Sequence, residues 1–348
     1  RPTSETLFCD YYASIVNSYR DLPKLYNQWC SVVRWEKSTR PFLRTREFLW
    51  QEGHTIHETA EEAEEETLRM LNIYKKFFEE YLAIPVLVGK KTEKEKFAGA
   101  EYTLSLEALM YDGVSLQSAT SHYFGQKFSI PFNVKFVDRN NKLQNVYQTS
   151  WGASSRMIGA LIMVHGDDNG LVLPPKIAPK QIVIATIRND EKVLEIANKL
   201  NSELKAQGYR VILDTSDKSA GFKFAEYEMK GVPLRIEIGP RDIANGHVVM
   251  ARRDNGEKET VDIENVCEKV KVLLDEIQKF MYDKALKHTR ERTYTCTDLE
   301  EVKKIMNTKP GFIKAMWCGD SECELKMKEI RGMKSRCIPF EEEHISDH

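Results

Sequence analysis

One stretch, residues 33–50, constrains the fold of this chain more than any other; it reads VRWEKSTRPFLRTREFLW. Its two ends carry the β-branched and aromatic residues that are typical of strands, and Pro41 between them is typical of a loop. The pattern predicts an antiparallel hairpin with Arg34 and Arg44 on facing strands and Phe48 below them.

Two arginines and an aromatic ring on a rigid sheet suit a bound nucleotide. Guanidinium groups hold phosphate oxygens in a bidentate way and stay charged at any working pH, and an aromatic face can stack on a purine. The alternative is a half-buried hairpin whose arginines pair with Glu36 and Glu47. This stretch alone leaves both interpretations open.

Three further segments favour the first interpretation. The spacing Arg-x-Glu, a loop and then Arg-x-x-x-Phe resembles motif 2 of the class II aminoacyl-tRNA synthetases, and residues 32–55 as a whole resemble the prolyl-tRNA synthetase family. Residues 148–156, QTSWGASSR, precede an apolar helix and resemble motif 3; such a turn suits anion binding by backbone N–H groups. Residues 3–5 resemble the Thr-x-Glu loop of the prolyl enzymes, and residues 120–126, TSHYFGQ, also match that family.

The resemblance covers essentially the whole chain and implies a multidomain protein of α+β and α/β type. Residues 1–178 are expected to form a class II catalytic domain, an antiparallel sheet with flanking helices that lacks motif 1. Residues 179–283 are expected to form an α/β anticodon-binding domain, and residues 284–348 a small zinc-ribbon-like α+β domain. The proline-rich segment 173–179 predicts the first boundary, and alternating strands and helices beyond it predict a separate sheet.

Periodicity gives the individual elements. Helices are expected at residues 1–30, 59–82, 157–165, 192–206, 222–230 and 263–282. Strands are expected at residues 84–88, 182–187, 209–214, 233–239 and 247–252, with a β-rich region at 102–133.

The segment between motifs 2 and 3 is too short for a large editing insertion, which points to the eukaryote- and archaea-like type. The sequence also begins with a motif, so an upstream part is expected.

The composition describes a globular protein with 41% hydrophobic and 30% charged residues. A net charge of -2 provides no overall basic field, so a tRNA would be held by a local patch. No run of residues approaches the length of a transmembrane helix, and the first residues form no signal peptide. Seven scattered cysteines favour a reducing compartment. We therefore expect a cytoplasmic protein with neither membrane nor DNA among its partners.

The resemblance implies a two-step reaction with ATP and Mg²⁺: proline is activated to prolyl-adenylate and then transferred to tRNA(Pro). The implied catalytic residues are Arg34, which bridges the α-phosphate and the proline carboxylate, and Arg44 and Arg156, which hold the outer phosphates. The implied proline-binding residues are Thr3, Glu5, Arg34, Trp50, Glu52, Phe97 and His122. The implied ATP-binding residues are Arg34, Glu36, Arg44, Thr45, Phe48, Gln117, Thr120, Ser154 and Arg156.

The segments 231–242 and 251–254 resemble the anticodon-binding domain of the class IIa synthetases. Their implied tRNA-binding residues are Arg235, Arg241, Arg252 and Arg253. Basic side chains at strand ends suit RNA phosphates or stacked bases, and ordinary surface charge is the alternative. The resemblance also implies a homodimer.

Cys318 and Cys323 lie a short loop apart, a spacing compatible with zinc. Cys296 and Cys337 could complete four ligands by count. In the resembled family, however, the second pair comes from a Cys-x-Cys farther downstream, and Cys337 matches a position not expected to bind metal. The sequence therefore supplies two of the four ligands of a possible Zn²⁺ site.

Two competing functions stay open. The first is a synthetase-like protein that binds tRNA or a regulator but activates no amino acid. Four charged residues count against it, because a site that no longer activates an amino acid does not need them: Glu5, Arg34, Arg44 and Arg156. The second is another class IIa ligase such as a threonyl enzyme, which is expected to carry zinc in its pocket; no suitable His/Cys set lies among the three motifs.

Overall fold

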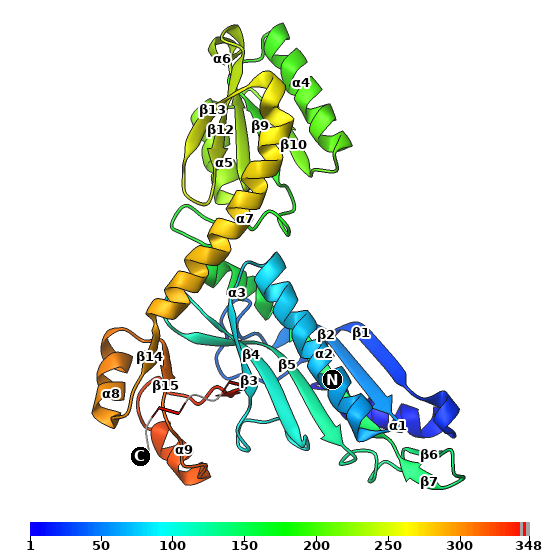
Figure 1. Cartoon of the computed structure of the whole chain (residues 1–348). Helices are drawn as coiled ribbons and strands as arrows, with labels where there is room; N and C mark the ends of the chain where they lie inside the picture. Colours follow the sequence, from blue (N-terminus) through cyan, green and yellow to red (C-terminus); the bar gives the residue numbers. More distant parts are fainter. Residues whose placement is uncertain (342–343, 346–348) are drawn as a thin grey trace. The chain divides into compact units, whose positions relative to one another are not determined.

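The computed structural model describes residues 1–341 and 344–345. The chain separates into two compact units, which are described here one at a time (Figure 1). The first comprises Arg1–Phe78, Val86–Ala160 and Thr289–His348, and the second comprises Glu79–Pro85 and Leu161–His288. No helix in the described part of the chain combines the length and the hydropathy that a membrane crossing requires.

A seven-stranded sheet forms the centre of the first unit. The strands lie in the order β1, β2, β8, β5, β4, β3, β16, and every neighbouring pair is antiparallel. Their bounds are β1 (Lys24–Val33), β2 (Glu47–His57), β3 (Val86–Lys90), β4 (Tyr102–Leu109), β5 (Ser115–Gly125), β8 (Tyr147–Ser154) and β16 (Ile338–Pro339). A separate small hairpin pairs β6 (Lys135–Val137) with β7 (Leu143–Asn145). The antiparallel sheet expected for the catalytic domain is therefore present.

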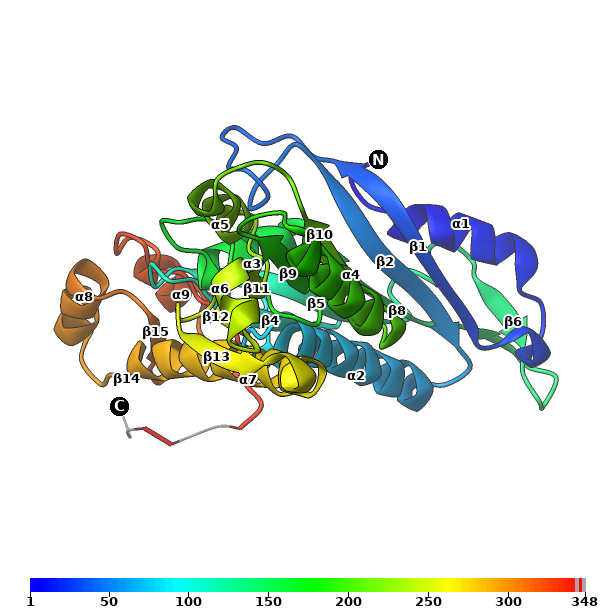
Figure 2. The same cartoon turned by 90° about the horizontal axis from the view of Figure 1, so that it is seen from above.

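Two helices pack on opposite faces of this sheet (Figure 2). They are α1 (Glu5–Ile15) and α2 (Ala60–Lys76), the second continuing into a π-helical turn. On one face, the Tyr12 hydroxyl of α1 donates to the carbonyl oxygen of His54 at 2.7 Å. On the other, the Ser121 hydroxyl of β5 donates to the α2 carbonyl at 2.8 Å. Successive side chains of a strand point to opposite faces, so the sequence alternates between residues that meet α1 and residues that meet α2.

The predicted hairpin is present, but the prediction that Arg34 and Arg44 lie on facing strands is wrong. Both residues belong to the connection between β1 and β2. The backbone N–H of Arg34 donates to the carbonyl of Arg46 at 2.7 Å, whereas Arg44 exchanges backbone hydrogen bonds with Arg40. Phe42, at a φ of 56°, closes this tight turn. The connection thus folds back on itself and removes Arg44 from the strand register.

The helix predicted over residues 1–30 is also wrong in its extent. α1 ends at Ile15, and β1 pairs with β2 along its whole length. Pro23, immediately before β1, lacks a backbone N–H and is not tolerated inside a helix. Strand pairing with β2, which the local pattern does not reveal, decides the conformation of this segment. The region predicted to be β-rich to residue 133 forms turns after Gly125.

The C-terminal segment belongs to the first unit. It contains β14 (Thr293–Thr295), α8 (Leu299–Thr308), β15 (Phe312–Lys314) and α9 (Ser321–Met327), and β14 pairs with β15 in parallel. β16 then joins the edge of the large sheet, where Ile338 lies opposite Lys90 of β3. The catalytic sheet is therefore completed by residues from the far end of the sequence.

The second unit contains a five-stranded mixed sheet in the order β10, β9, β11, β12, β13. The first three strands run parallel and the last three antiparallel. The strands are β9 (Ile182–Thr186), β10 (Val211–Asp214), β11 (Leu234–Ile238), β12 (His247–Arg252) and β13 (Lys258–Asp262). The helices are α4 (Glu191–Ala206), α5 (Ala220–Met229), α6 (Pro240–Ala244) and most of α7 (Val266–Glu291), and α3 (Arg156–His165) runs into this unit from the first.

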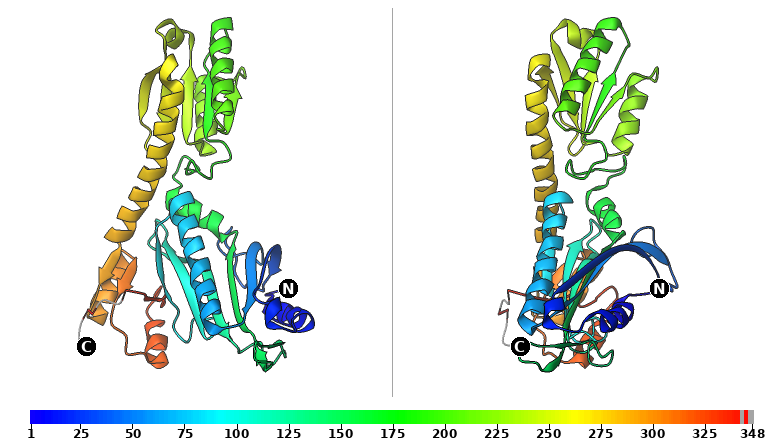
Figure 3. Two further views of the ribbon diagram at one scale, coloured as in Figure 1. Left: turned by 45° about the vertical axis from the view of Figure 1, so that its right-hand side comes forward. Right: turned by 90° about the vertical axis from the view of Figure 1, so that its right-hand side faces the viewer.

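Helices cover both faces of this second sheet (Figure 3). Ile182 and Ile184 of β9 share a buried apolar cluster with Leu200 of α4 and Val270 of α7. Val183, which projects from the opposite face of β9, packs with Tyr227 of α5. The strand–helix alternation predicted beyond the proline-rich segment is confirmed, because each strand was long and apolar enough to be recognised.

Candidate active site

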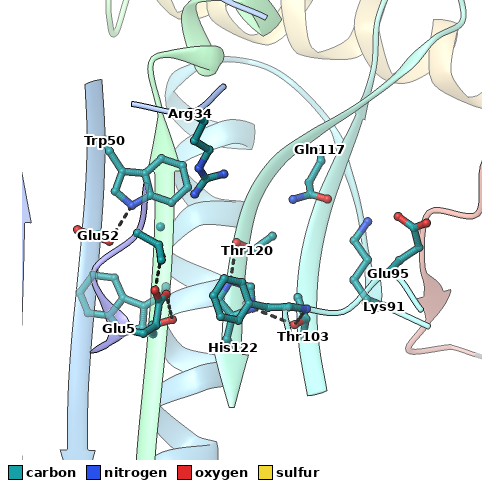
Figure 4. Close-up of a pocket in the computed structure, with 15 residues that line it drawn as sticks. Glu5, Arg34, Trp50, Glu52, Lys91, Glu95, Thr103, Gln117, Thr120 and His122 are labelled. Atoms are coloured by element: carbon teal, nitrogen blue, oxygen red, sulfur yellow. Dashed lines mark hydrogen bonds between the residues drawn. The ribbon is translucent and has the colours of Figure 1, made fainter. Parts of the chain in front are cut away.

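A cavity of about 170 Å³ lies on the face of the large sheet that is opposite to α2 (Figure 4). Nine of the residues that line it are site residues predicted from the sequence: Thr3, Glu5, Arg34, Trp50, Glu52, Phe97, Gln117, Thr120 and His122. Six others that line it were not predicted: Lys91, Glu95, Thr103, Ser150, Trp151 and Gly152. All of them belong to the first unit.

Strand alternation explains why these particular side chains meet. Residues two apart on one strand, such as Trp50 and Glu52 on β2, project from the same face. Gln117 and Thr120 of β5 are three apart, but the register of β4 against β5 shifts between Leu106 and Glu107. This bulge places one extra residue in β5, which reverses the alternation, so the side chain of Gln117 points to the same face as that of Thr120.

Glu5, in the first turn of α1, supplies a carboxylate to the cavity. Its side chain is buried and accepts hydrogen bonds from the hydroxyls of Thr3 and, at 3.3 Å, of Ser150. Among the described residues, the side chains that hydrogen-bond to this carboxylate are hydroxyl groups. A buried carboxylate of this kind favours a cationic ligand, because its charge is expensive to leave without one.

Glu52 differs from Glu5, because the protein itself satisfies it. Its Oε1 accepts hydrogen bonds from Gln28 at 2.6 Å and from Ser4, and its Oε2 accepts one from the Trp50 indole at 3.2 Å and lies 3.2 Å from Nε2 of His54. Burial raises the pKa of Glu52, but the hydrogen bonds outweigh burial and bring the pKa down to about 2. Glu52 is therefore an ionised side chain that orients Trp50 over the cavity.

His122 and Phe97 form an apolar wall. The two rings lie 4.8 Å apart, and Thr103 and Thr120 hydrogen-bond to Nδ1 and Nε2 of His122 at 2.9 and 3.1 Å. Burial lowers the pKa of His122 to about 3, so the ring is neutral at physiological pH. With both nitrogens engaged, His122 presents its ring to the cavity.

Three arginines, Arg34, Arg44 and Arg156, lie close enough to act on one another electrostatically. Arg34 lines the cavity, with its guanidinium 5.4 Å from the centre of the Phe48 ring. Arg156 donates to the carbonyl oxygens of Leu43 at 3.0 Å and Gln117 at 3.3 Å. Burial lowers the pKa of Arg156, and the positive charges of Arg44 and Arg34 lower it further. A cluster of like charges of this kind favours an anionic ligand.

Six of the predicted nucleotide-binding residues lie outside the cavity lining. Arg44 forms an ion pair with Glu36 at 3.4 Å, as in the alternative interpretation of the hairpin. Ser154 accepts a hydrogen bond from the backbone N–H of Arg156 at 3.2 Å, so it shapes the turn that opens α3. Phe48 lies next to Arg34, and Thr45 lies in the β1–β2 connection. Of these six, Phe48 contacts Arg34, and Arg156 lies within electrostatic reach of Arg34.

Gly152 sets the position of Trp50. A Cβ atom at residue 152 would lie 2.5 Å from Cζ2 of the Trp50 indole, so only glycine leaves room for this ring. We expect Gly152→Ala to displace the indole and raise the KM for the ligand that the ring contacts by about tenfold or more, since a misplaced contact can cost this much. Steady-state kinetics measure the change. Gly221→Ala is the matched control, because nothing lies within 4 Å of a Cβ there; equal KM values in the two variants would contradict the expectation.

Comparison with known proteins decides between the competing functions. Residues 1–165 match the model of the tRNA synthetase class II core domain (G, H, P, S and T), residues 181–273 match the anticodon binding domain, and residues 299–348 match the C-terminal domain of prolyl-tRNA synthetase. Curated proline–tRNA ligases from Bacillus cereus and Clostridium novyi are each 60% identical over all 348 residues, and the match covers 73% of their length. The chain belongs to the prolyl-tRNA synthetase family.

Solved prolyl-tRNA synthetases have the same fold. Two structures from Cryptosporidium parvum, one complexed with halofuginone and AMPPNP and one with L-proline and AMP, superpose with a TM-score of 0.95. They are 43% and 44% identical to this chain; the matches cover 98% of this chain and 71% and 75% of theirs. The activity is therefore ATP-dependent ligation of proline to tRNA, and neither a threonyl enzyme nor a synthetase-like protein without activation describes it.

In the anticodon-binding domain of this synthetase, three of the four predicted tRNA-binding arginines are held by carboxylates. Arg235 pairs with Glu237 at 2.9 Å, Arg252 with Asp254 at 2.7 Å and Arg253 with Asp167 at 2.6 Å. All three side chains are at most 15% exposed. Arg241, on α6, is exposed to solvent. The structure therefore does not gather the four arginines into one free basic patch.

Proposed function

We propose that the cavity binds proline between Glu5 and the wall of His122 and Phe97, and that ATP extends from Arg34 towards Arg156 and Arg44. The observation that carries this assignment is the opposition of one carboxylate and one guanidinium within a single cavity, Glu5 and Arg34. A zwitterionic amino acid needs both charges. Trp50 and Phe97 add the apolar surface that a five-membered ring needs.

The chain's own residues perform the first step by positioning charges. Glu5 holds the secondary ammonium of proline, which leaves the carboxylate facing Arg34. A carboxylate oxygen forms a bond to the α-phosphorus, the bond between the α-phosphorus and the bridging oxygen breaks, and pyrophosphate leaves with the electron pair. Charge builds up on phosphoryl oxygens during this step, so fixed cations stabilise the transition state more than proton transfer does. Arg34 lies nearest to the reacting atoms, and Arg156 and Arg44 receive the outer phosphates.

Mg²⁺ would arrive with the nucleotide, where it would neutralise charge on the phosphates. Mg²⁺ bound to a nucleotide takes most of its ligands from phosphates and water, with one or two from the protein. The described residues contain no group of three or more His, Cys, Asp or Glu side chains that could hold a metal ion. They fit an ion that arrives with ATP, and Gln117 offers a side-chain oxygen at the cavity.

Amino-acid-dependent exchange of pyrophosphate into ATP tests the assignment. We expect the highest kcat/KM with proline and a value for alanine lower by about 10–200-fold, because an apolar pocket discriminates weakly between ligands of similar size. Threonine should be rejected at least as strongly, since its hydroxyl has no partner against the wall of Phe97 and His122. Equal exchange with threonine and proline would show that the cavity is not a proline site.

For the second step we propose that tRNA(Pro) contacts the anticodon-binding domain, where Arg241 is the exposed member of the predicted set. The support is that Arg241 is exposed on α6, whereas Arg235 and Arg252 lie at the other end of β11 and β12 and are held by carboxylates. Their ion pairs fix the domain surface in the free protein, and exchange of carboxylate for phosphate would recruit them. The affinity of Arg241→Ala for tRNA(Pro), measured at two salt concentrations, tests how much Arg241 contributes to tRNA binding.

We also propose that the protein is a homodimer. Leu25 and Trp29 of β1 and Leu49 of β2 project from one face at the edge of the sheet and are 54%, 81% and 70% exposed. An apolar strip of this kind on an edge strand is typical of a protein interface. Light scattering in solution measures the mass against the 40.3 kDa of one chain, and a monomer at micromolar concentration would exclude the dimer.

Zinc binding and a cytoplasmic location stay predictions from the sequence. Cys318 and Cys323 are exposed, and the neighbouring Cys318 raises the pKa of Cys323, but no third ligand among the described residues joins them, so they do not fit a closed zinc site. Metal analysis of the purified chain and of Cys318→Ser tests the first prediction, and cell fractionation tests the second.

A further inference from the structure

The loop that follows β3 connects the cavity to the C-terminal segment. Lys91, Glu95 and Phe97 of this loop all line the cavity. Figure 4 shows Lys91 and Glu95 at one side of the site, next to the faint red ribbon of the C-terminal segment. No prediction from the sequence connected residues so far apart.

The first connection is a buried lysine. Nζ of Lys91 donates to Oε1 of Glu107 at 2.6 Å and to the carbonyl oxygen of Arg336 at 2.6 Å. The side chains of Lys91 and Glu107 are 4% and 0% exposed. Beside them β16 pairs with β3, and a Cβ at Gly89 would lie 2.4 Å from the carbonyl oxygen of Ile338. The backbones are therefore in closest contact at the base of the loop.

Two side chains of the α9 region hold the middle of the loop. The Thr92 hydroxyl donates at 3.0 Å to Glu324, which is 1% exposed and also accepts from Ser335. Lys328 forms an ion pair with Glu95 at 2.5 Å, with the two side chains 29% and 33% exposed. The C-terminal segment thus contacts the loop at three consecutive points, Lys91, Thr92 and Glu95, before the chain reaches Phe97.

We propose that Lys328 and Glu324 are positioning residues for proline activation, which hold this loop so that Phe97 closes the proline end of the cavity. The inference rests on the proposed function, because it assumes that Phe97 contacts proline. Neither residue touches the substrate. A loop is ordered only when its contacts exceed the entropy that ordering costs, and these contacts come from outside the sheet. Their loss should therefore weaken proline binding and spare ATP.

Lys328→Glu tests the proposal in the full chain, because it places a second carboxylate opposite Glu95. We expect the KM for proline in pyrophosphate exchange to rise about fivefold or more, and the KM for ATP to stay within about twofold. Lys328→Arg should keep the ion pair and the normal KM. Lys326→Glu is the matched control, since it makes the same charge change on the exposed part of α9.

A raised KM for proline in Lys328→Glu but not in Lys326→Glu supports the proposal. Equal values for Lys328→Glu and Lys326→Glu, or a parallel rise in the KM for ATP, overturn it. Glu324→Gln removes the charge near Thr92 and should shift the KM for proline in the same direction, with thermal melting reporting whether each variant is folded. Phe97→Ala distinguishes failure of the proposed proline site from failure of the positioning role. If Phe97→Ala leaves the KM for proline unchanged, the proposed function fails. If Phe97→Ala raises this KM and Lys328→Glu does not, only the positioning role is removed.

Discussion

Arg34→Ala should abolish pyrophosphate exchange and leave the fold intact. The guanidinium lines the cavity and donates to the carbonyl oxygen of Pro2 at 3.0 Å, so it is fixed before substrates arrive. A preorganised cation that meets charge developing in the transition state typically contributes about 100-fold or more to kcat. We expect a loss of at least this size, measured as proline-dependent exchange at saturating ATP and proline.

The control for Arg34 is another arginine of the same unit. The guanidinium of Arg20 lies over the Tyr19 ring at 4.7 Å, away from the cavity lining. Arg20→Ala should exchange normally. Arg34→Lys keeps the charge but loses the planar fork, so an intermediate rate is expected. Near-normal exchange by Arg34→Ala, with an unchanged melting temperature, would remove Arg34 from the mechanism.

Glu5→Gln should raise the KM for proline and have little effect on the KM for ATP. Glutamine keeps the shape of the side chain and its contacts with Thr3 and Ser150, but removes the charge that faces the substrate ammonium. Truncating one partner of a buried charge pair costs about 2 kcal/mol or more, which corresponds to roughly 30-fold in affinity. Exchange kinetics with proline varied at saturating ATP give this value directly.

Asp10→Asn provides the comparison, because Asp10 lies on the exposed side of the same helix and loses the same charge. Its KM for proline should match that of the unmodified protein. If Glu5→Gln behaves like Asp10→Asn, the ammonium is bound elsewhere, and the proline end of the cavity must be reassigned.

The central site residues could be predicted because each stands in a short, ordered pattern. Glu5, Arg34 and His122 lie in segments whose resemblance to one family identifies them without knowledge of the fold. The geometry around them could not be predicted in the same way. The position of Arg44 depends on a turn at Phe42 with positive φ, and that of Gln117 on a bulge in β5, neither of which leaves a periodic signal.

The residues that were missed depend on contacts distant in sequence. Lys91 and Glu95 lie in a charged run that, taken alone, predicts only a solvated loop, and their orientation depends on residues 324–336. Ser150 and Gly152 could have been found, because they alternate with the predicted Ser154 on one strand. The carboxylate partners of Arg235, Arg252 and Arg253 follow the arginines closely or lie across the domain, and only the folded structure shows that they neutralise them.

The pairing of β16 with β3 also has a consequence for the newly made protein. The chain leaves the ribosome N-terminus first. β3 therefore emerges long before residues 338–339, which pair with its edge. During that interval the strand offers unpaired backbone groups, which can recruit a second nascent chain. Protection against aggregation and completion of the loop that carries Phe97 therefore arrive together, when residues 338–339 have been made.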